Sequence, residues 1–141
     1  MTTIAFDGEV IAYDSRETQG SLICNDNCNK HHIKDGVHFF IAGTSGHEGR
    51  LISAFLDGPE DDYPDSLFST AIVVRDGDVF ECAIDKDEGY WSCAVTCPIA
   101  LGSGSRHALT AMDCGLSAKD AVKMAIKRDA NSGGRVRTFR P

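Results

Sequence analysis

Thr2 is the residue of this chain whose type and place could do the most chemistry. It follows Met1, and threonine is small enough for a preceding initiator methionine to be trimmed away. Trimming would leave one residue with a hydroxyl nucleophile and a free α-amine, whose pKa of roughly 7.7–8.0 lets it accept a proton near neutral pH. Thr2 would then supply nucleophile and base together. A start of Met-Thr-Thr is common, so the rest of the chain has to support this interpretation.

A second candidate is Asp129, which lies at the end of a predicted helix near the end of the chain. The partial negative charge at a helix C-terminus favours cations, and Lys127 and Arg128 obey that rule. Asp129 breaks it. A residue that breaks a local rule is often retained for a functional site, so we expect a role for this carboxylate.

Asp-Gly pairs divide much of the chain into predicted β-hairpins, because Asp-Gly between apolar runs is a strong tight-turn signal. Asp7-Gly8, a two-residue turn signal, is predicted to join strands at 3–6 and 10–13 in a tight hairpin. Further ribbons are predicted from 21–33 into 37–42 and from 70–74 into 79–83, and single strands at 90–95, 99–101 and 136–139.

Three helices are predicted between these strands. Helical periodicity at 51–56 stops at Gly58-Pro59, and a helix near 106–114 stops at Gly115. Ser117, followed three residues later by Asp120, forms a capping-box pattern that predicts the start of the last helix. Hairpins with few helices predict one α+β domain over 1–141: a four-layer αββα sandwich of two antiparallel sheets flanked by helices.

Composition excludes several classes of function. The net charge of −7 argues against nucleic acid, because phosphate binding needs a basic face. No apolar run approaches the ~20 residues of a membrane span, and no basic segment precedes the first apolar run as in a signal peptide. We therefore expect a cytoplasmic protein whose six cysteines are thiols.

The charges are also uneven along the chain. Acidic residues crowd positions 57–65, whereas 119–140 is basic. Both segments are interpreted as solvated surfaces, and the alternative is that they complement each other between copies of the chain.

The cysteines leave a zinc site open as an alternative. Cys24, Cys28, His31 and His32 could form one half and Cys93 with Cys97 the other. The spacing of three residues between each cysteine pair, instead of two, disfavours this reading. No metal and no cofactor are therefore predicted.

Several segments in the same order resemble the proteasome β subunits and their bacterial relative, the peptidase HslV. They are the start Thr2–Ala5, the run Val10–Arg16, Lys30 sixteen residues after Asp14, the turn Gly43-Thr44-Ser45-Gly46, the run Ile99–Ser105 with Gly-Ser-Gly, and Lys127–Gly134 with its Asp-x-x-Ser-Gly-Gly pattern. Each fragment alone is weak, but together they span nearly the whole chain. The resemblance implies a shortened N-terminal nucleophile hydrolase.

The resemblance also implies a role for each matching residue. Thr2 would attack a scissile carbonyl, with its own amine as the base. Lys30, held by Asp14, would lower the pKa of the hydroxyl, although an exposed salt bridge would look the same in sequence. The Gly43 N–H would stabilise the oxyanion. Ser103, Asp129 and Ser132 would orient the amine, and Cys28 and Ile41 would line the substrate pocket.

The chain departs from the family between Gly43 and Ser69, where one short helix is predicted instead of two longer ones. No propeptide is expected ahead of Thr2. The function implied is a threonine-type endopeptidase acting on peptides or unfolded proteins, assembled as a homo-oligomeric ring with an ATPase unfoldase as a partner. The alternative is an inactive scaffold or assembly protein that retains Met1, since a retained methionine makes the Thr2 amine an amide.

Overall fold

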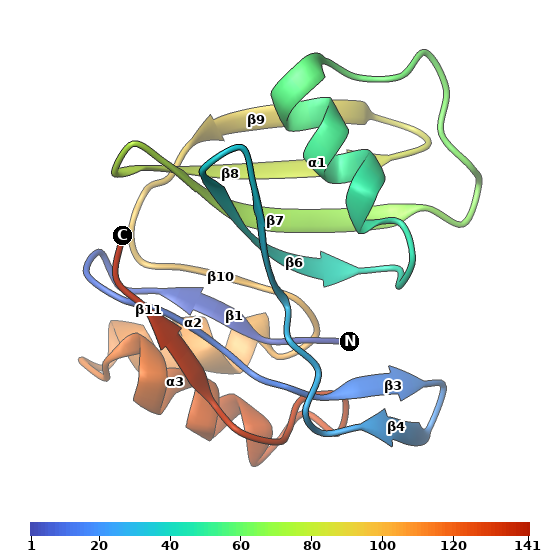
Figure 1. Ribbon diagram of the computed structural model, residues 1–141. Helices are drawn as coiled ribbons and strands as arrows, with labels where there is room; N and C mark the ends of the chain where they lie inside the picture. Colours follow the sequence, from blue (N-terminus) through green and yellow to red (C-terminus); the bar gives the residue numbers. More distant parts are fainter. The chain divides into compact units, whose positions relative to one another are not determined.

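The computed structural model describes residues 1–141, which divide into two compact units. The first, here the N-terminal unit, comprises Met1–Lys30 and Thr96–Pro141; the second, here the central unit, comprises His31–Val95 (Figure 1). Each unit contains an antiparallel sheet and at least one helix, so the predicted α+β class is confirmed. None of the helices has the length and apolarity required to cross a membrane.

The N-terminal unit is built on a four-stranded sheet of order β10-β1-β2-β11, with all pairings antiparallel. Its strands are β1 (Ile4–Phe6), β2 (Ile11–Tyr13), β10 (Ile99–Leu101) and β11 (Arg137–Phe139). Strands β1 and β2 are buried on both faces, which explains their continuous apolar runs. All four strands lie where the sequence predicts them.

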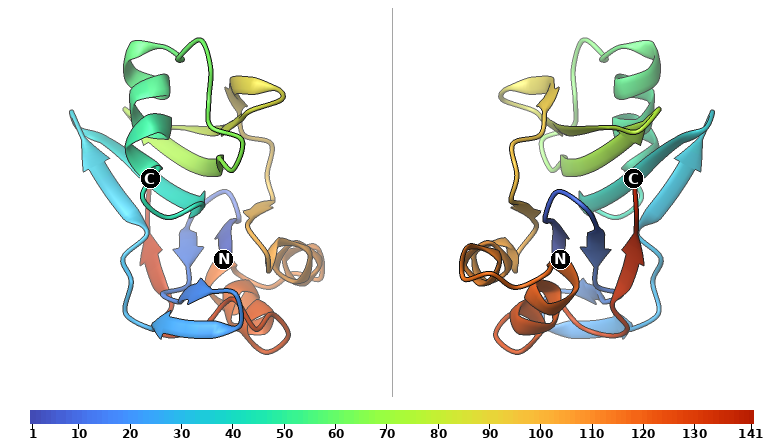
Figure 2. Two further views of the ribbon diagram at one scale, coloured as in Figure 1. Left: turned by 90° about the vertical axis from the view of Figure 1, so that its right-hand side faces the viewer. Right: turned by 90° about the vertical axis from the view of Figure 1, so that its left-hand side faces the viewer.

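Helices α2 (Ser105–Asp113) and α3 (Ala118–Ile126) pack side by side on one face of this sheet (Figures 1 and 2). Their core is rich in alanine, so the helices can approach the strands closely; it contains Ala5, Ala12, Ala108, Ala118, Ala121 and Ala125. The predicted cap is confirmed, since the Ser117 hydroxyl accepts from the Asp120 N–H at 3.2 Å.

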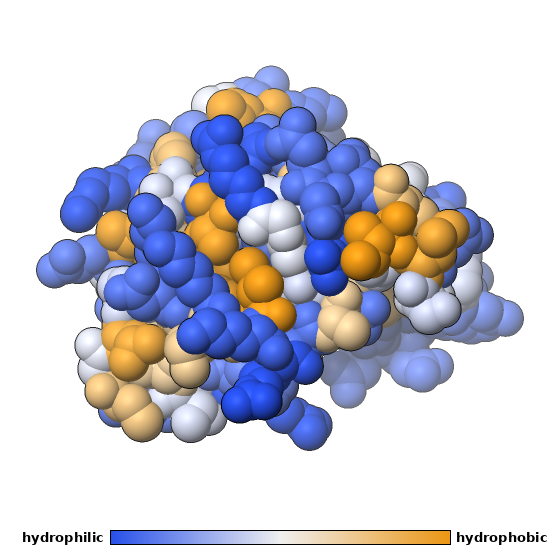
Figure 3. All heavy atoms as spheres, turned by 90° about the horizontal axis from the view of Figure 1, so that it is seen from below, coloured by the Kyte–Doolittle hydropathy of each residue, from blue (hydrophilic) through white to orange (hydrophobic).

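A separate two-stranded hairpin follows the first pair of strands. It consists of β3 (Glu17–Gln19) and β4 (Leu22–Asn25). The prediction of one continuous ribbon from 21 to 33 is wrong, because irregular backbone separates β4 from the next strand. Leu22 and Ile23 are exposed, and the face drawn in Figure 3 shows apolar patches among hydrophilic residues.

The central unit is a five-stranded antiparallel meander of order β5-β6-β7-β8-β9. Its strands are β5 (His31–Lys34), β6 (Val37–Gly43), β7 (Phe68–Arg75), β8 (Asp78–Asp85) and β9 (Gly89–Ala94). Helix α1 (Glu48–Asp57) packs against one face through Leu51, Ile52 and Ala54. One short helix between Gly43 and Ser69 is thus confirmed.

The Asp-Gly pairs form turns of two different lengths. Asp35-Gly36 and Asp76-Gly77 are two-residue turns with positive φ at both positions, as a right-twisted hairpin requires. Asp7-Gly8 is different, because Phe6 pairs with Ile11 and the connection is four residues long. The Asp7 carboxylate accepts from the Glu9 and Val10 N–H groups and stabilises this longer loop, so the predicted two-residue turn there is wrong.

Candidate active site

Thr2 is buried just ahead of β1, where the turn that follows β10 covers it. The Thr2 N–H donates to the Ser103 hydroxyl at 3.2 Å. Gly102, with φ of +91°, lies so close to the Thr2 carbonyl that a Cβ would overlap its oxygen. The Gly-Ser-Gly sequence therefore lets backbone approach backbone and places one hydroxyl on the nitrogen of Thr2.

Asp14 is a fully buried carboxylate that receives four hydrogen bonds. Its Oδ1 accepts from the Lys30 ammonium at 2.7 Å and from the Thr3 N–H at 3.0 Å. Its Oδ2 accepts from the N–H groups of Gly133 at 2.9 Å and Arg16 at 3.2 Å. A buried charge is tolerated when it is paired and hydrogen-bonded in this way, so Asp14 ties four segments of the N-terminal unit together.

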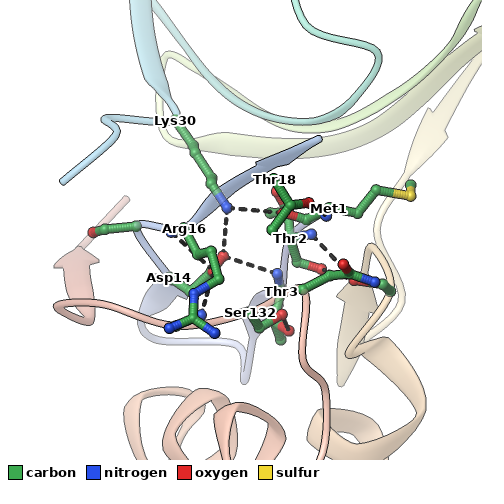
Figure 4. Close-up of polar contacts among 12 residues, drawn as sticks. Met1, Thr2, Thr3, Asp14, Arg16, Thr18, Lys30 and Ser132 are labelled. Atoms are coloured by element: carbon green, nitrogen blue, oxygen red, sulfur yellow. Dashed lines mark hydrogen bonds and ion pairs between the residues drawn. The ribbon is translucent and has the colours of Figure 1, made fainter. Parts of the chain in front are cut away.

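Lys30 points from the end of the irregular segment toward the start of the chain (Figure 4). Besides Asp14, its Nζ donates to the carbonyl oxygen of Met1 at 3.2 Å, which is the carbonyl of the Met1–Thr2 peptide bond. Burial lowers the pKa of Lys30 from its ordinary value, while the Asp14 charge opposes this shift. The Lys30 side chain is thus a buried cation that contacts the peptide bond between Met1 and Thr2.

The Asp129 carboxylate accepts hydrogen bonds from two serine hydroxyl groups. Its Oδ2 accepts from Ser103 at 2.7 Å and from Ser132 at 2.6 Å. Ser132 has a single hydroxyl hydrogen, so the Thr3 hydroxyl 2.6 Å away must donate to Ser132. Burial raises the pKa of Asp129, but the hydrogen bonds from Ser132 and Ser103 outweigh it and hold that pKa below its usual value. Thr2 and Thr3 are therefore linked to the same carboxylate.

Met1 occupies a defined place beside this cluster. Its amine donates to the Thr18 hydroxyl at 2.9 Å (Figure 4). Burial, followed by the charge of Lys30, lowers the pKa of that amine. While Met1 is attached, the nitrogen of Thr2 is an amide and has no basic lone pair.

The sequence-predicted residues fall into two groups. The N-terminal unit holds Thr2, Asp14, Lys30, Ser103, Asp129 and Ser132, and it brings them together in one network. It also holds the half-buried Cys28.

Gly43 and Ile41 belong to the central unit. Gly43 adopts φ of +138° and approaches β7 so closely that a Cβ would overlap the Phe68 carbonyl. Ile41 packs in the core beneath α1. Local packing explains both residues, and their roles in catalysis and binding stay predictions.

The residues proposed for the alternative zinc site do not form a set of metal ligands. Cys24, Cys93 and Cys97 are exposed thiols. No group of three or more His, Cys, Asp or Glu side chains stands close enough to hold a metal ion. His31 and His38 instead contact each other, with ring nitrogens 2.9 Å apart.

Two residues of the network carry no predicted role. Thr3 is fully buried with its hydroxyl in the Asp129 chain, and Arg16 contacts the segment that carries Ser132. Both lie inside motifs already noted, Thr2–Ala5 and Val10–Arg16. The available signal for Thr3 was its place directly before the apolar run Ile4–Phe6. Nothing in the sequence shows which backbone carbonyl the Arg16 side chain contacts.

Neither a protein-family model nor a curated protein matches the chain. Solved structures do match. BPH from Thiobacillus denitrificans in complex with epoxomicin has a TM-score of 0.69 at 20% identity over 98% of this chain and 96% of that one. Eukaryotic HslV from Trypanosoma brucei has a TM-score of 0.69 at 18% identity over 98% of this chain and 97% of that one. A second structure of Thiobacillus denitrificans BPH has a TM-score of 0.66 at 19% identity over 98% and 95% of the two chains.

These likenesses show the fold. The 141-residue chain has the N-terminal nucleophile hydrolase fold of HslV-type proteins, as the resemblance in its sequence implied.

Proposed function

We propose that this chain is a threonine-type endopeptidase whose nucleophile is Thr2, exposed by removal of Met1. The observation that carries the proposal is the network around the Thr2 nitrogen. The Thr2 N–H donates to the Ser103 hydroxyl, which itself donates to the Asp129 carboxylate. Lys30, paired with Asp14, donates to the carbonyl of the peptide bond that joins Met1 to Thr2.

The proposed reaction uses these groups in two steps. The Thr2 hydroxyl attacks the scissile carbonyl, the free amine of Thr2 takes the hydroxyl proton, and that proton passes to the leaving amine as the peptide C–N bond breaks. Water, deprotonated by the same amine, then hydrolyses the ester and restores the hydroxyl. The Lys30 ammonium lowers the pKa of the attacking hydroxyl, and Asp14 holds it in place.

The remaining predicted residues complete the proposal. The Gly43 N–H is the proposed oxyanion donor, and Cys28 with Ile41 the proposed lining for a small apolar substrate side chain. The substrate class is a peptide or unfolded protein, cleaved inside a homo-oligomeric ring in the cytoplasm with an ATPase unfoldase as partner. These statements are supported by the resemblance to the HslV and proteasome family.

Labelling tests the proposal directly. Epoxomicin is bound in one of the similar structures, and an epoxyketone needs both the hydroxyl and the free amine of a terminal threonine. Met1-free protein should form a covalent adduct that peptide mapping places on Thr2, and Met1-retaining protein should not. Thr2→Ala should abolish turnover and labelling while leaving the unfolding transition in urea unchanged. A Met1-free protein that is folded yet neither labels nor cleaves peptides contradicts the proposal.

The pH profile is a second test. The rate should rise with pH as the Thr2 amine loses its proton, because only the neutral amine accepts one. It should fall again as Lys30 loses its charge, and burial lowers that pKa, so the alkaline limb should lie below the ordinary lysine value of 10.5. Lys30→Arg, which keeps a cation of much higher pKa, should move the alkaline limb upward.

A second candidate function is an inactive scaffold that keeps Met1. It is favoured by the two contacts that fix Met1, from its amine to Thr18 and from Lys30 to its carbonyl. Mass spectrometry of the N-terminus of protein isolated from its native cells separates the candidates: an N-terminal threonine supports the peptidase, and an intact methionine supports the scaffold.

A further inference from the structure

Arg16 lies beside the buried Asp14 in Figure 4 and makes three hydrogen bonds through its guanidinium. Two go to the Asp26 carboxylate, from Nε to Oδ1 at 2.8 Å and from Nη2 to Oδ2 at 3.1 Å. The third runs from Nη1 to the carbonyl oxygen of Ala130 at 3.1 Å. Arg16 therefore connects the end of the β3–β4 hairpin to the segment after α3, more than a hundred residues away in sequence.

The segment after α3 is packed directly onto this ion pair. A Cβ on Gly133 would overlap the Arg16 guanidinium, and a Cβ on Gly134 would overlap the carbonyl oxygen of Asp26. The Ser15 N–H also donates to the Gly133 carbonyl at 2.9 Å. The two glycines thus let the loop lie flat against Arg16 and Asp26, and we call these two side chains with the loop 130–134 the clasp.

The clasp holds a stretch of chain that has no regular structure of its own. Helix α3 ends at Ile126, and the next strand starts at Arg137. Asp129 and Ser132 lie between them, on either side of the carbonyl that Arg16 contacts. Their hydrogen bonds of 2.6–2.7 Å around the Asp129 carboxylate depend on the path of this loop.

We propose that Arg16 and Asp26 are positioning residues of the peptidase, which fix the loop so that Asp129 and Ser132 stay aligned with the Thr2 amine. The inference rests on the proposed function. Neither side chain touches the nucleophile; both act through the loop. A guanidinium suits this task, because its planar fork satisfies a carboxylate with two donors and still offers a third to a carbonyl.

The first measurement is steady-state peptide cleavage by Met1-free protein carrying Arg16→Gln, Asp26→Asn, or both. A displacement of about 1 Å in a supporting group can cost about 10²-fold, and we expect a loss of that order in kcat for Arg16→Gln with KM nearly unchanged. The double variant should be no slower than Arg16→Gln alone, because the two side chains act as one unit. Arg16→Lys should restore only part of the rate, since an ammonium cannot make the three contacts together.

The pH profile distinguishes positioning from a general loss of folded protein. The Asp129 carboxylate stabilises the ammonium form of Thr2, so it raises the pKa of that amine. When the clasp is opened this support weakens, the amine pKa falls, and the acid limb of kcat/KM moves to lower pH. A variant that is merely less folded loses rate with the limb unchanged.

Arg50→Gln is the matched control. Arg50 pairs with Glu60 in the central unit, also ten residues apart, with side chains 38% and 48% exposed. It should leave kcat and the acid limb unchanged. The proposal is overturned if Arg16→Gln keeps the wild-type kcat and acid limb, or if Arg50→Gln reproduces its effect.

Hydrogen exchange separates this inference from the proposed function. If wild-type Met1-free protein neither labels nor cleaves, the peptidase proposal fails and kinetics cannot judge the clasp. If amides at 130–134 exchange faster in Arg16→Gln than in the wild type, while Arg50→Gln leaves their exchange unchanged, Arg16 still holds the loop. Unchanged exchange there would overturn the clasp itself.

Discussion

The two units of the molecule differ in what they bury. The N-terminal unit buries six polar side chains, from Thr2, Thr3, Asp14, Ser15, Lys30 and Ser132. The central unit, with the larger sheet, buries only Ser69 and Thr70 among polar residues. Its core is formed by residues such as Phe39, Leu51 and Ile84. The N-terminal unit adds buried hydrogen bonds around charges to its own apolar core, whereas the central unit depends mainly on apolar packing.

The difference has an energetic meaning. Burying a charge is unfavourable unless a partner and hydrogen bonds compensate it, and an apolar replacement is often as stable. Asp14 and Lys30 compensate each other, and three N–H groups satisfy the rest of the carboxylate. Stability alone does not call for such an arrangement, whereas a site that must present a cation to a reacting group does. Pairing a change in one unit with its counterpart in the other therefore tests this difference.

The largest effect is expected from the buried ion pair. Asp14→Ala leaves the Lys30 ammonium buried without its counter-charge, and breaking such a pair costs about 3–5 kcal/mol. In the central unit, Glu60→Gln removes an exposed pair with Arg50, which is worth about 0–1 kcal/mol. Urea unfolding of both variants measures the contrast. Equal small losses would mean that the N-terminal unit does not depend on its buried charges.

Glycines give the next contrast. Gly102→Ala puts a Cβ into the Thr2 carbonyl at positive φ, so we expect strain of about 1–3 kcal/mol and, from displacement of Thr2, a kcat lower by about 10²-fold. Gly77→Ala in the central unit also has positive φ but meets open space. It should show a smaller stability loss and unchanged kcat. Comparable activity losses in both variants would argue that Gly102 has no special relation to Thr2.

The contrast between the units also explains what the sequence could predict. Hairpins in the central unit were predictable because their signals are local: Asp35-Gly36 and Asp76-Gly77 specify two-residue turns through their own conformations. The continuous ribbon from 21 to 33 was predicted wrongly. Apolar residues such as Leu22 and Ile23 favour a strand there, but β4 stops at Asn25, and the segment beyond it instead carries the buried Lys30.

The site was predictable only as a set of residue types in order. Thr2, Asp14, Lys30, Ser103, Asp129 and Ser132 could be named, and the structure brings them into one network. The hydrogen bonds from the Thr3 hydroxyl to Ser132 and from Arg16 to the Ala130 carbonyl could not be predicted from the sequence. Both join residues more than a hundred positions apart. No local pattern reports which distant backbone a side chain will meet.

Thr3 offers a contrast between matched hydroxyls. Thr3→Val keeps the shape but removes the donor to Ser132, and Thr70→Val in the central unit removes a buried bond to the Cys82 carbonyl at 3.1 Å. Each should cost about 1 kcal/mol of stability. Only Thr3→Val should also lower kcat, by about tenfold, and Thr3→Ser should restore it. A rate loss in both variants, or in neither, would remove Thr3 from the site.

The smallest effect is expected at Ser69, and it should have the opposite sign. Its hydroxyl is fully buried in β7 and has no hydrogen-bond partner, the one such side-chain atom in the chain. Ser69→Ala removes an uncompensated polar group and leaves little empty space, so the protein should gain about 0.5 kcal/mol. Ser132→Ala in the N-terminal unit removes a hydroxyl of the same kind whose bonds are satisfied, and should lose stability instead. If Ser69→Ala is destabilising, the hydroxyl has a partner in solution, and the central unit depends on buried polar contacts as the N-terminal unit does.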